Sequence, residues 1–308
     1  MSVLITGGTG FVGRYVIERV DDPIVTSRNR QAALNKLGDS VTDAIQWSPQ
    51  SDPLVLDPAM DCRAVVNLMG DSIAEGRWTE KKKKSIRDSR VQGTLKLVEA
   101  VSKLEKKPEV FVSASAVGFY GDPGVVEVTE SHPMGDGFLP EVCKQWEDAA
   151  DTISALGVRV VKLRIGIVLG PDGGACEKMI PMFKLGLGGK LGSGRQWFPW
   201  IHVEDLAGLI DWAIRTPSAS GIYNATAPNP VTNGQFTAAL AKSLGRWAVL
   251  PAPKFGLKLA LGEFANSLFF SQRVIPQRAV EEGYDFQFPE LDGALKDIVS
   301  RSGRGYES

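Results

Sequence analysis

The stretch Leu4-Ile5-Thr6-Gly7-Gly8-Thr9-Gly10-Phe11-Val12-Gly13 decides the fold of this chain. An apolar strand enters a glycine-rich turn, and an amphipathic run that continues to Val20 leaves it as a helix. In such a turn Gly7 permits the tight bend, Gly10 lets the backbone approach a pyrophosphate, and Gly13 lets helix and strand pack closely. The free N–H groups at the start of the helix favour phosphate oxygens. The stretch therefore predicts a dinucleotide-binding unit rather than an ordinary strand–helix turn.

The bulk composition excludes several classes of protein. Of 308 residues, 43% are apolar and 23% are charged, which is typical of a globular protein. A net charge of −1 creates no strong field for nucleic acid or an anionic membrane. No apolar run approaches the roughly 20 residues that a membrane span needs. Because the chain begins directly with a core strand, we expect no signal or transit peptide.

Cysteine and histidine usage argues against a metal site. Cys62, Cys143 and Cys176 are far apart and lack metal-ligand spacing, so we interpret them as reduced thiols in a cytoplasmic protein. His132 and His202 are the only histidines, which excludes a histidine-rich metal centre.

Strand and helix patterns alternate through the first half of the chain. Such repeats of nearly continuous apolar strands with intervening helices predict an α/β fold, a Rossmann-type doubly wound parallel sheet covered on both faces. The expected strands span residues 3–5, 24–26, 44–47, 64–68, 110–113 and 159–163, and the expected helices span 11–20, 31–37, 79–104 and 141–156.

The pattern loosens beyond Gly170. Residues 186–194 are rich in glycine and predict a mobile loop or hairpin, and helices are expected over 203–216, 233–244 and 255–268, with a strand at 223–224. We therefore expect residues 1–169 to form the dinucleotide-binding domain. Residues 170–308 would form a smaller substrate-side lobe interleaved with the carboxyl edge of the sheet.

Residues after the second expected strand bear on the choice of cofactor. An NAD-binding site usually carries Asp or Glu about 20 residues beyond the glycines, but this chain offers Ser27, Arg28 and Arg30 there. A guanidinium suits a phosphate dianion through its paired N–H donors. The pattern favours NADP(H) over NAD(H); the alternative is that Arg28 is a solvated loop residue.

A second cofactor-facing segment follows the fourth expected strand. After Asn67, the backbone of Leu68, Met69 and Gly70 would lie beside a ribose of the cofactor, with Gly70 allowing close approach. An ordinary strand-end turn is the alternative. We therefore expect Leu68, Met69 and Gly70 to contact the cofactor together with the glycine loop. The loop residues expected to contact it are Gly7, Thr9, Gly10, Phe11, Val12 and Gly13.

The motifs together resemble the extended or atypical branch of the short-chain dehydrogenase/reductase superfamily, and more closely its epimerase-like proteins. The resemblance covers essentially the whole chain and implies the fold and a nicotinamide dinucleotide, but no substrate. It is carried by residues 6–13, 67–70, Val91-Gln92-Gly93-Thr94, Ser113-Ala114-Ser115-Ala116, residues 117–121, Leu169-Gly170-Pro171-Asp172-Gly173-Gly174-Ala175, residues 200–205 and Val274-Ile275-Pro276-Gln277-Arg278.

Arg90 stands on the long helix where extended members of the superfamily usually carry Asn. An inward-facing guanidinium there would reach the phosphate or ribose of the cofactor, and Ser85 lies a little over one turn before it. The alternative is an exposed residue after the run Lys81–Lys84, which we interpret as a solvated helix face.

The catalytic group departs from the superfamily pattern. Typical members carry Tyr-x-x-x-Lys on the helix after the serine strand, where the tyrosine acts as acid or base and the lysine holds the nicotinamide ribose. Here Lys144 is preceded four positions earlier by Pro140, and the neighbouring register pairs Leu139 with Cys143. Neither register contains a tyrosine, so Lys144 would hold the ribose or belong to the helix surface.

The remaining catalytic candidates come from the resemblance. Ser115 matches the superfamily serine, and Tyr120 is the only nearby phenol; it would replace the missing tyrosine or shape the loop beneath the cofactor.

Two further features have both a functional and a structural interpretation, and two arginines have a functional one. Asp205 forms a polar pair with His202 or caps the helix that starts at Leu206. The aromatic run 197–200 lines a pocket or packs the core, and Arg195 and Arg278 are candidates to clamp an anionic substrate.

Two functions remain open from the sequence. The first is an NADP(H)-dependent oxidoreductase or epimerase that acts on an unidentified small molecule, such as a sugar nucleotide or carbonyl compound. The second is a non-catalytic NADP(H) sensor with a regulatory or division-related role. Both predict no metal, nucleic-acid or membrane partner, a cytoplasmic location and a possible homodimer through the two long helices.

Overall fold

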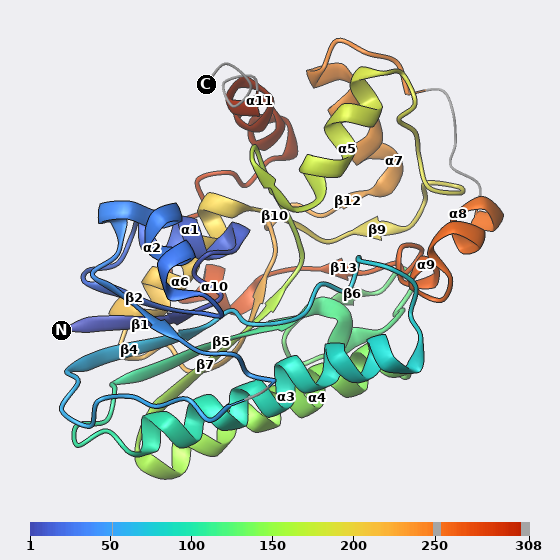
Figure 1. Ribbon diagram of the computed structural model, residues 1–308. Helices are drawn as coiled ribbons and strands as arrows, with labels where there is room; N and C mark the ends of the chain where they lie inside the picture. Colours follow the sequence, from blue (N-terminus) through green and yellow to red (C-terminus); the bar gives the residue numbers. More distant parts are fainter. Residues whose placement is uncertain (51, 249–253, 303–308) are drawn as a thin grey trace.

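A seven-stranded parallel sheet forms the centre of the computed structural model, which describes residues 1–50, 52–248 and 254–302 (Figure 1). The order β11-β7-β5-β4-β1-β2-β3 reverses direction beside β1, as a doubly wound sheet requires. This confirms the predicted Rossmann-type α/β fold. The strands are β1 (Ser2–Thr6), β2 (Pro23–Ser27), β3 (Asp43–Gln46), β4 (Cys62–Asn67), β5 (Val110–Ala116), β7 (Arg159–Ile165) and β11 (Gly221–Ala225).

Helices cover both faces of the sheet (Figure 1). One face packs against α1 (Phe11–Ile17), α2 (Arg30–Leu37) and α6 (Val203–Arg215), and the other against α3 (Glu80–Ser102) and α4 (Phe138–Asp151). The central strands are apolar on both sides because each side faces a helical layer. Leu4 and Ile5, adjacent in β1, are both fully buried but belong to opposite cores.

The C-terminal lobe has a core of its own. Helices α5 (Gly174–Lys184), α7 (Asn233–Ser243) and α11 (Leu291–Ser302) enclose it, together with two-stranded pairs β8–β10 and β9–β12. These short strands are β8 (Ile167–Gly170), β9 (Trp197–Phe198), β10 (Trp200–His202) and β12 (Val231–Thr232); a third pair joins β6 (Glu127–Val128) to β13 (Arg273–Val274), which precedes α10 (Gln277–Glu281). Helix α6 and strand β11 follow residue 170 in the chain but belong to the central sheet and its helical layer. The part of the chain after residue 170 is therefore interleaved between the lobe and the sheet.

Two predicted helices differ from the structure. The segment 255–268 is two helices, α8 (Lys254–Leu261) and α9 (Phe264–Ser267), because Gly262 adopts φ +64° and breaks the run. The helix predicted over 141–156 begins earlier, at Phe138, and its last turn, 152–156, is a 3₁₀ helix. Residues 186–194 form no helix or strand, in agreement with the predicted loop.

Contacts within the glycine loop explain its spacing. Gly7 has φ +72°, and a Cβ there would lie 2.8 Å from the carbonyl oxygen of Leu68. A Cβ on Gly13 would lie 2.4 Å from the oxygen of Gly7 and 2.6 Å from the Cα of Gly8. Helix α1 therefore packs directly on the turn through Gly13, as the sequence predicted.

His202, rather than Asp205, caps helix α6. The helix begins at Val203, and Nδ1 of His202 accepts the N–H of Glu204 at 3.2 Å. Asp205 lies inside the first turn, where its carboxylate accepts the backbone N–H groups of Gln287 and Phe288. The predicted cap at Asp205 is wrong because the helix already begins at Val203, where the 203–216 helix was expected to start; Asp205 instead fixes the segment that leads to α11.

Replacing Gly13 by alanine is expected to lower the free energy of unfolding by at least about 2 kcal/mol, because the methyl group has no room against the loop backbone. Gly293→Ala is the matched control. Gly293 lies in α11, and a Cβ added there would meet no atom within 4 Å, so alanine should stabilise by up to about 1 kcal/mol. Urea unfolding measures both; equal effects would contradict the packing.

Acid should destabilise the fold through His202. Burial lowers the pKa of this fully buried imidazole to about 4, although the Asp297 carboxylate, 3.3 Å from Nε2, opposes the shift. The unfolded chain takes up the proton near pH 6.5, so stability is lost as pH falls below that value. We expect a loss of about 2 kcal/mol between pH 7 and 5. His202→Asn retains a capping side chain and should flatten this slope in urea titrations; an unchanged slope would refute the assignment.

Candidate functional site

The carboxyl ends of β1, β2 and β4 form the candidate cofactor edge. Asn67 holds the end of β4: its side chain accepts from Thr6 Oγ1 at 2.8 Å and donates to Thr94 and Ser113. With the side chain thus bound in the core, the following backbone continues past the glycine loop, and Leu68 N–H donates to the oxygen of Thr6 at 3.1 Å. The predicted residues of the glycine loop and of 68–70 are therefore neighbours.

Two side chains in this set point away from the edge. Met69 is buried against α3, where its Sδ would lie 2.6 Å from a Cβ on Gly93. The ring of Phe11 fits into a turn of the lobe: a Cβ on Gly170, Gly173 or Gly174 would come within 2.7 Å of it. Phe11 and Met69 can serve a cofactor only through their backbone.

Neighbouring residues strengthen the contact between α1 and this turn of the lobe. Arg14 forms an ion pair with Asp172 at 2.8 Å, and Tyr15 donates to the same carboxylate at 2.7 Å. The ring of Tyr15 also meets that of Phe11 edge-on at 5.8 Å. The glycine loop is thereby tied to the first residues of the lobe.

Arg28 remains available beside the edge. Its side chain is exposed and has no hydrogen bond or ion pair with any described residue. Ser27 Oγ is turned toward the backbone of Asn29, and Arg30 is held by Asp43 at 2.6 Å and by the oxygen of Ala44. Of the predicted group, Arg28 is the cation left free for a ligand.

Sequence reasoning missed Lys36. Its Nζ donates to the oxygen of Thr9 at 2.9 Å, which places a second positive charge at the glycine loop. A lysine on the exposed side of α2 gives no signal of this kind in the sequence, because the contact depends on how α2 packs.

Arg90 turns inward, which is the first of the two alternatives open from the sequence. Its guanidinium lies against Gly70, where a Cβ would be 2.9 Å from Cζ, and Nη1 donates to the oxygens of Asp71 and Ile86. It also lies 5.1 Å above the ring of Trp146. Burial lowers the pKa of Arg90, yet the group has no ion pair among the described carboxylates.

Ser85 and two residues of the run Lys81–Lys84 contact other parts of the protein, where the sequence predicted a cofactor contact and a solvated face. Ser85 donates to Asp71 at 2.9 Å, which Lys82 also binds at 2.9 Å, so Ser85 supports the loop after β4. Lys83 pairs with Glu263 of the lobe at 2.6 Å. The interpretation of 81–84 as a wholly solvated face is wrong, because Lys82 and Lys83 face neighbouring elements.

Ser115 and Tyr120 belong to one buried polar network. Ser115 donates to Glu147 at 2.7 Å, and Glu147 forms a bidentate ion pair with Arg164 at 2.8 and 2.9 Å. Arg164 donates to Tyr120 at 3.0 Å, and Tyr120 donates to Asn224 at 2.6 Å.

The network leaves neither hydroxyl open to solvent. Ser115 and Tyr120 are each 2% exposed, and burial raises the pKa of Tyr120 to about 12. These partners support the structural alternative for Tyr120, and they place Ser115 inside the layer between the sheet and α4.

Lys144 lies on the outer face of α4. It is about half exposed and pairs with Asp148 at 2.6 Å. Leu139 and Cys143 instead face the turn after β5, where a Cβ on Gly118 would lie 3.5 and 3.6 Å from them. The inward register is therefore Leu139–Cys143, and the half-exposed side chain of Lys144 favours the alternative that it belongs to the helix surface.

The other anion-clamp candidates have structural roles or none. Arg278 donates to the oxygens of Ser220 and Ile222 and pairs with Glu282, so it secures β11. Arg195 is an exposed loop residue. Within the aromatic run 197–200, Trp200 is buried and Phe198 stacks on Phe236 at 4.4 Å, which favours packing over a pocket wall.

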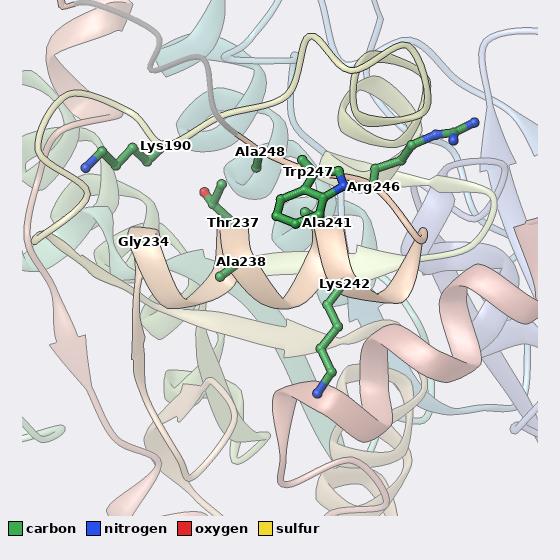
Figure 2. Close-up of a pocket in the computed structure, with 9 residues that line it drawn as sticks. All are labelled: Lys190, Gly234, Thr237, Ala238, Ala241, Lys242, Arg246, Trp247 and Ala248. Carbon is green, nitrogen blue, oxygen red and sulfur yellow. The ribbon is translucent and has the colours of Figure 1, made fainter.

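A groove of about 410 Å³ lies on α7, in the lobe (Figure 2). None of the predicted site residues line it, and Lys190, Lys242 and Arg246 spread away from it on three sides. In the described residues no group of histidine, cysteine, aspartate or glutamate is arranged for a metal, and the three cysteines are buried and unpaired. None of the helices in that part of the chain is long and apolar enough to cross a membrane.

The fold and the glycine loop define a Rossmann-type protein of the dinucleotide-binding class. Residues 3–226 match the NAD dependent epimerase/dehydratase family, and the chain belongs to that family. Residues 252–298 match a domain of unknown function, DUF1731.

Similar proteins match along nearly the whole chain. An epimerase family protein SDR39U1 homolog of Arabidopsis thaliana, described as chloroplastic, is 41% identical over 97% of this chain and 87% of its own length. Epimerase family protein YfhF of Bacillus subtilis is 38% identical, covering 97% and 98%. The crystal structure of human SDR39U1 (isoform 2) with NADPH superposes with a TM-score of 0.86 at 35% identity, covering 97% of this chain and 99% of that one.

Glu147→Ala should lower the free energy of unfolding by about 3–5 kcal/mol, because it leaves Arg164 buried without its counter-ion. Lys144→Ala on the same helix should change it by less than about 1 kcal/mol, because exposed ion pairs contribute little. Urea unfolding of both variants tests whether Glu147 faces inward on α4 and Lys144 outward. A larger loss of unfolding free energy for Lys144→Ala would contradict that orientation of the helix.

Proposed function

We propose that this protein binds NADP(H) at the carboxyl edge of β1, β2 and β4 and uses it as an oxidoreductase or epimerase on a small molecule. The observation that carries the proposal is the glycine loop, whose Gly7 and Gly13 contacts leave no space for side chains. The NADPH in the human relative's crystal structure supports the same cofactor here.

The residues fit the parts of such a cofactor. The loop of residues 7–13 would hold the diphosphate through backbone N–H groups, and the backbone of 68–70 would face a ribose. Arg28 would pair with the 2′-phosphate, since its exposed guanidinium has no hydrogen bond or ion pair with any residue that the structure describes. Arg90, a partly buried cation without an ion pair among the described carboxylates, would face the diphosphate or ribose next to Gly70.

The chemistry rests on the cofactor, which supplies a hydride when bound. Ser115 and Tyr120 are engaged in the buried network, and Cys143 is buried with its pKa raised to about 12. These three residues would maintain the shape of the site. A proton would then come from water.

A non-catalytic sensor is the second candidate, favoured by the seating of Phe11 in the lobe. A nucleotide bound by the glycine loop would shift Phe11 against the turn at 170–174, and a shift of that turn would change the position of the lobe. A cytoplasmic location, small-molecule partners and a homodimer through α3 and α4 remain proposals; the plant relative is described as chloroplastic.

The first experiment measures binding and turnover together. The purified protein is titrated with NADPH and NADH by calorimetry and then incubated with NADPH and a panel of sugar nucleotides and carbonyl compounds. Cofactor oxidation with any compound supports an oxidoreductase, and conversion of a sugar nucleotide to its epimer without net oxidation supports an epimerase. Tight NADPH binding with neither change supports the sensor. Absence of binding would refute both.

Arg28→Ala should weaken NADPH binding about 10- to 100-fold and leave NADH binding nearly unchanged, because only NADPH carries the 2′-phosphate. Arg30→Ala is the matched control, since Asp43 already occupies that guanidinium. Equal weakening of both nucleotides by Arg28→Ala would reject the assignment.

A further inference from the structure

Helix α3 presents a row of three cations to the aromatic side of α4. Lys83, Arg87 and Arg90 are spaced four and three residues apart and so share one face. Lys83 and Arg87 lie 5.6 and 5.9 Å from the ring of Phe138, and Arg90 lies 5.1 Å from that of Trp146. Like charges so close together on one helix destabilise it unless anions compensate them.

Only Lys83 in this row has a carboxylate partner among the described residues. Glu263 from the lobe lies 2.6 Å from its Nζ. Arg90 donates to two backbone oxygens, next to Gly70. Arg87 has neither an acceptor nor an ion pair in the described part of the chain, and its Nε is buried without a partner. A buried guanidinium donor without an acceptor is costly, so the site favours an incoming anion.

Arg87 occupies the position between the proposed cofactor and the lobe. One turn further along α3 is Arg90, at the end of β4. One turn before Arg87, Lys83 contacts the lobe through Glu263. The ring of Trp78 lies 5.3 Å from that of Phe138 and 5.6 Å from that of Phe264, which also joins this region to the lobe. Helix α9 lies near the first turns of α3 (Figure 1).

We infer that Arg87 binds an anionic group, a carboxylate or a phosphate, on the small-molecule substrate. The inference rests on the proposed function, because it places that group beside the cofactor edge. The guanidinium offers paired N–H donors to the two oxygens of such a group. The ring of Phe138 limits the water that competes for them.

The test uses the full chain saturated with NADPH, so that the cofactor's own phosphate sites are filled. Phenyl phosphate, benzoate and neutral benzyl alcohol are titrated separately by calorimetry. We expect at least one anion to bind at least tenfold more tightly than the alcohol, and the better anion distinguishes phosphate from carboxylate. Arg87→Gln should weaken that anion about tenfold or more and leave NADPH binding unchanged.

Lys84→Gln is the matched control, because Lys84 lies on the exposed side of the same helix and pairs with Asp88. It should alter neither titration. The inference is overturned if the unsubstituted protein prefers neither anion to the alcohol, or if Arg87→Gln binds the anion as well as the original does. Failure of the proposed function is a separate result, namely no NADPH binding before any anion is added; the anion titrations on the protein alone then still judge Arg87.

Discussion

The close approach of three backbone segments underlies the whole site. Helix α1 rests on the glycine turn through Gly13, and the turn rests on the end of β4 through Gly7. A methyl group at either position would separate strand, turn and helix, because it would lie closer to neighbouring backbone atoms than van der Waals contact allows. Every contact proposed for a cofactor depends on this packing, since it fixes the direction of the backbone N–H groups.

The same loop is connected to the C-terminal lobe. Phe11 is held by three glycines of the turn that leads into α5, and Arg14 and Tyr15 bind Asp172 of that turn. An enzyme would use this connection to hold the lobe beside the cofactor, and a sensor would use it to pass the state of the loop to the lobe. The two proposed functions therefore differ in chemistry and not in architecture.

Polar residues in the core of this protein serve mainly to position the strand ends. Asn67 unites β1, β4, β5 and α3, and the pair Glu147–Arg164 joins α4 to β7 while binding Ser115 and Tyr120. Each member has a partner, which is the condition for keeping charge and amide groups inside a protein. By contrast, Arg87 and Arg90 have no ion pair among the described carboxylates, and Arg87 also has no hydrogen-bond acceptor there.

Local spacing and strand burial were enough to predict the parallel sheet, the glycine turn and Arg28 as the candidate cation after β2, because each of these is written in a short run of residues. Which side chains face the site was decided by the packing of whole elements. Lys144 and Cys143 are adjacent on α4, and only the seating of that helix turns the cysteine inward and the lysine outward. Likewise the contacts of Lys36 and Arg87 join elements distant in the chain, which no local pattern encodes.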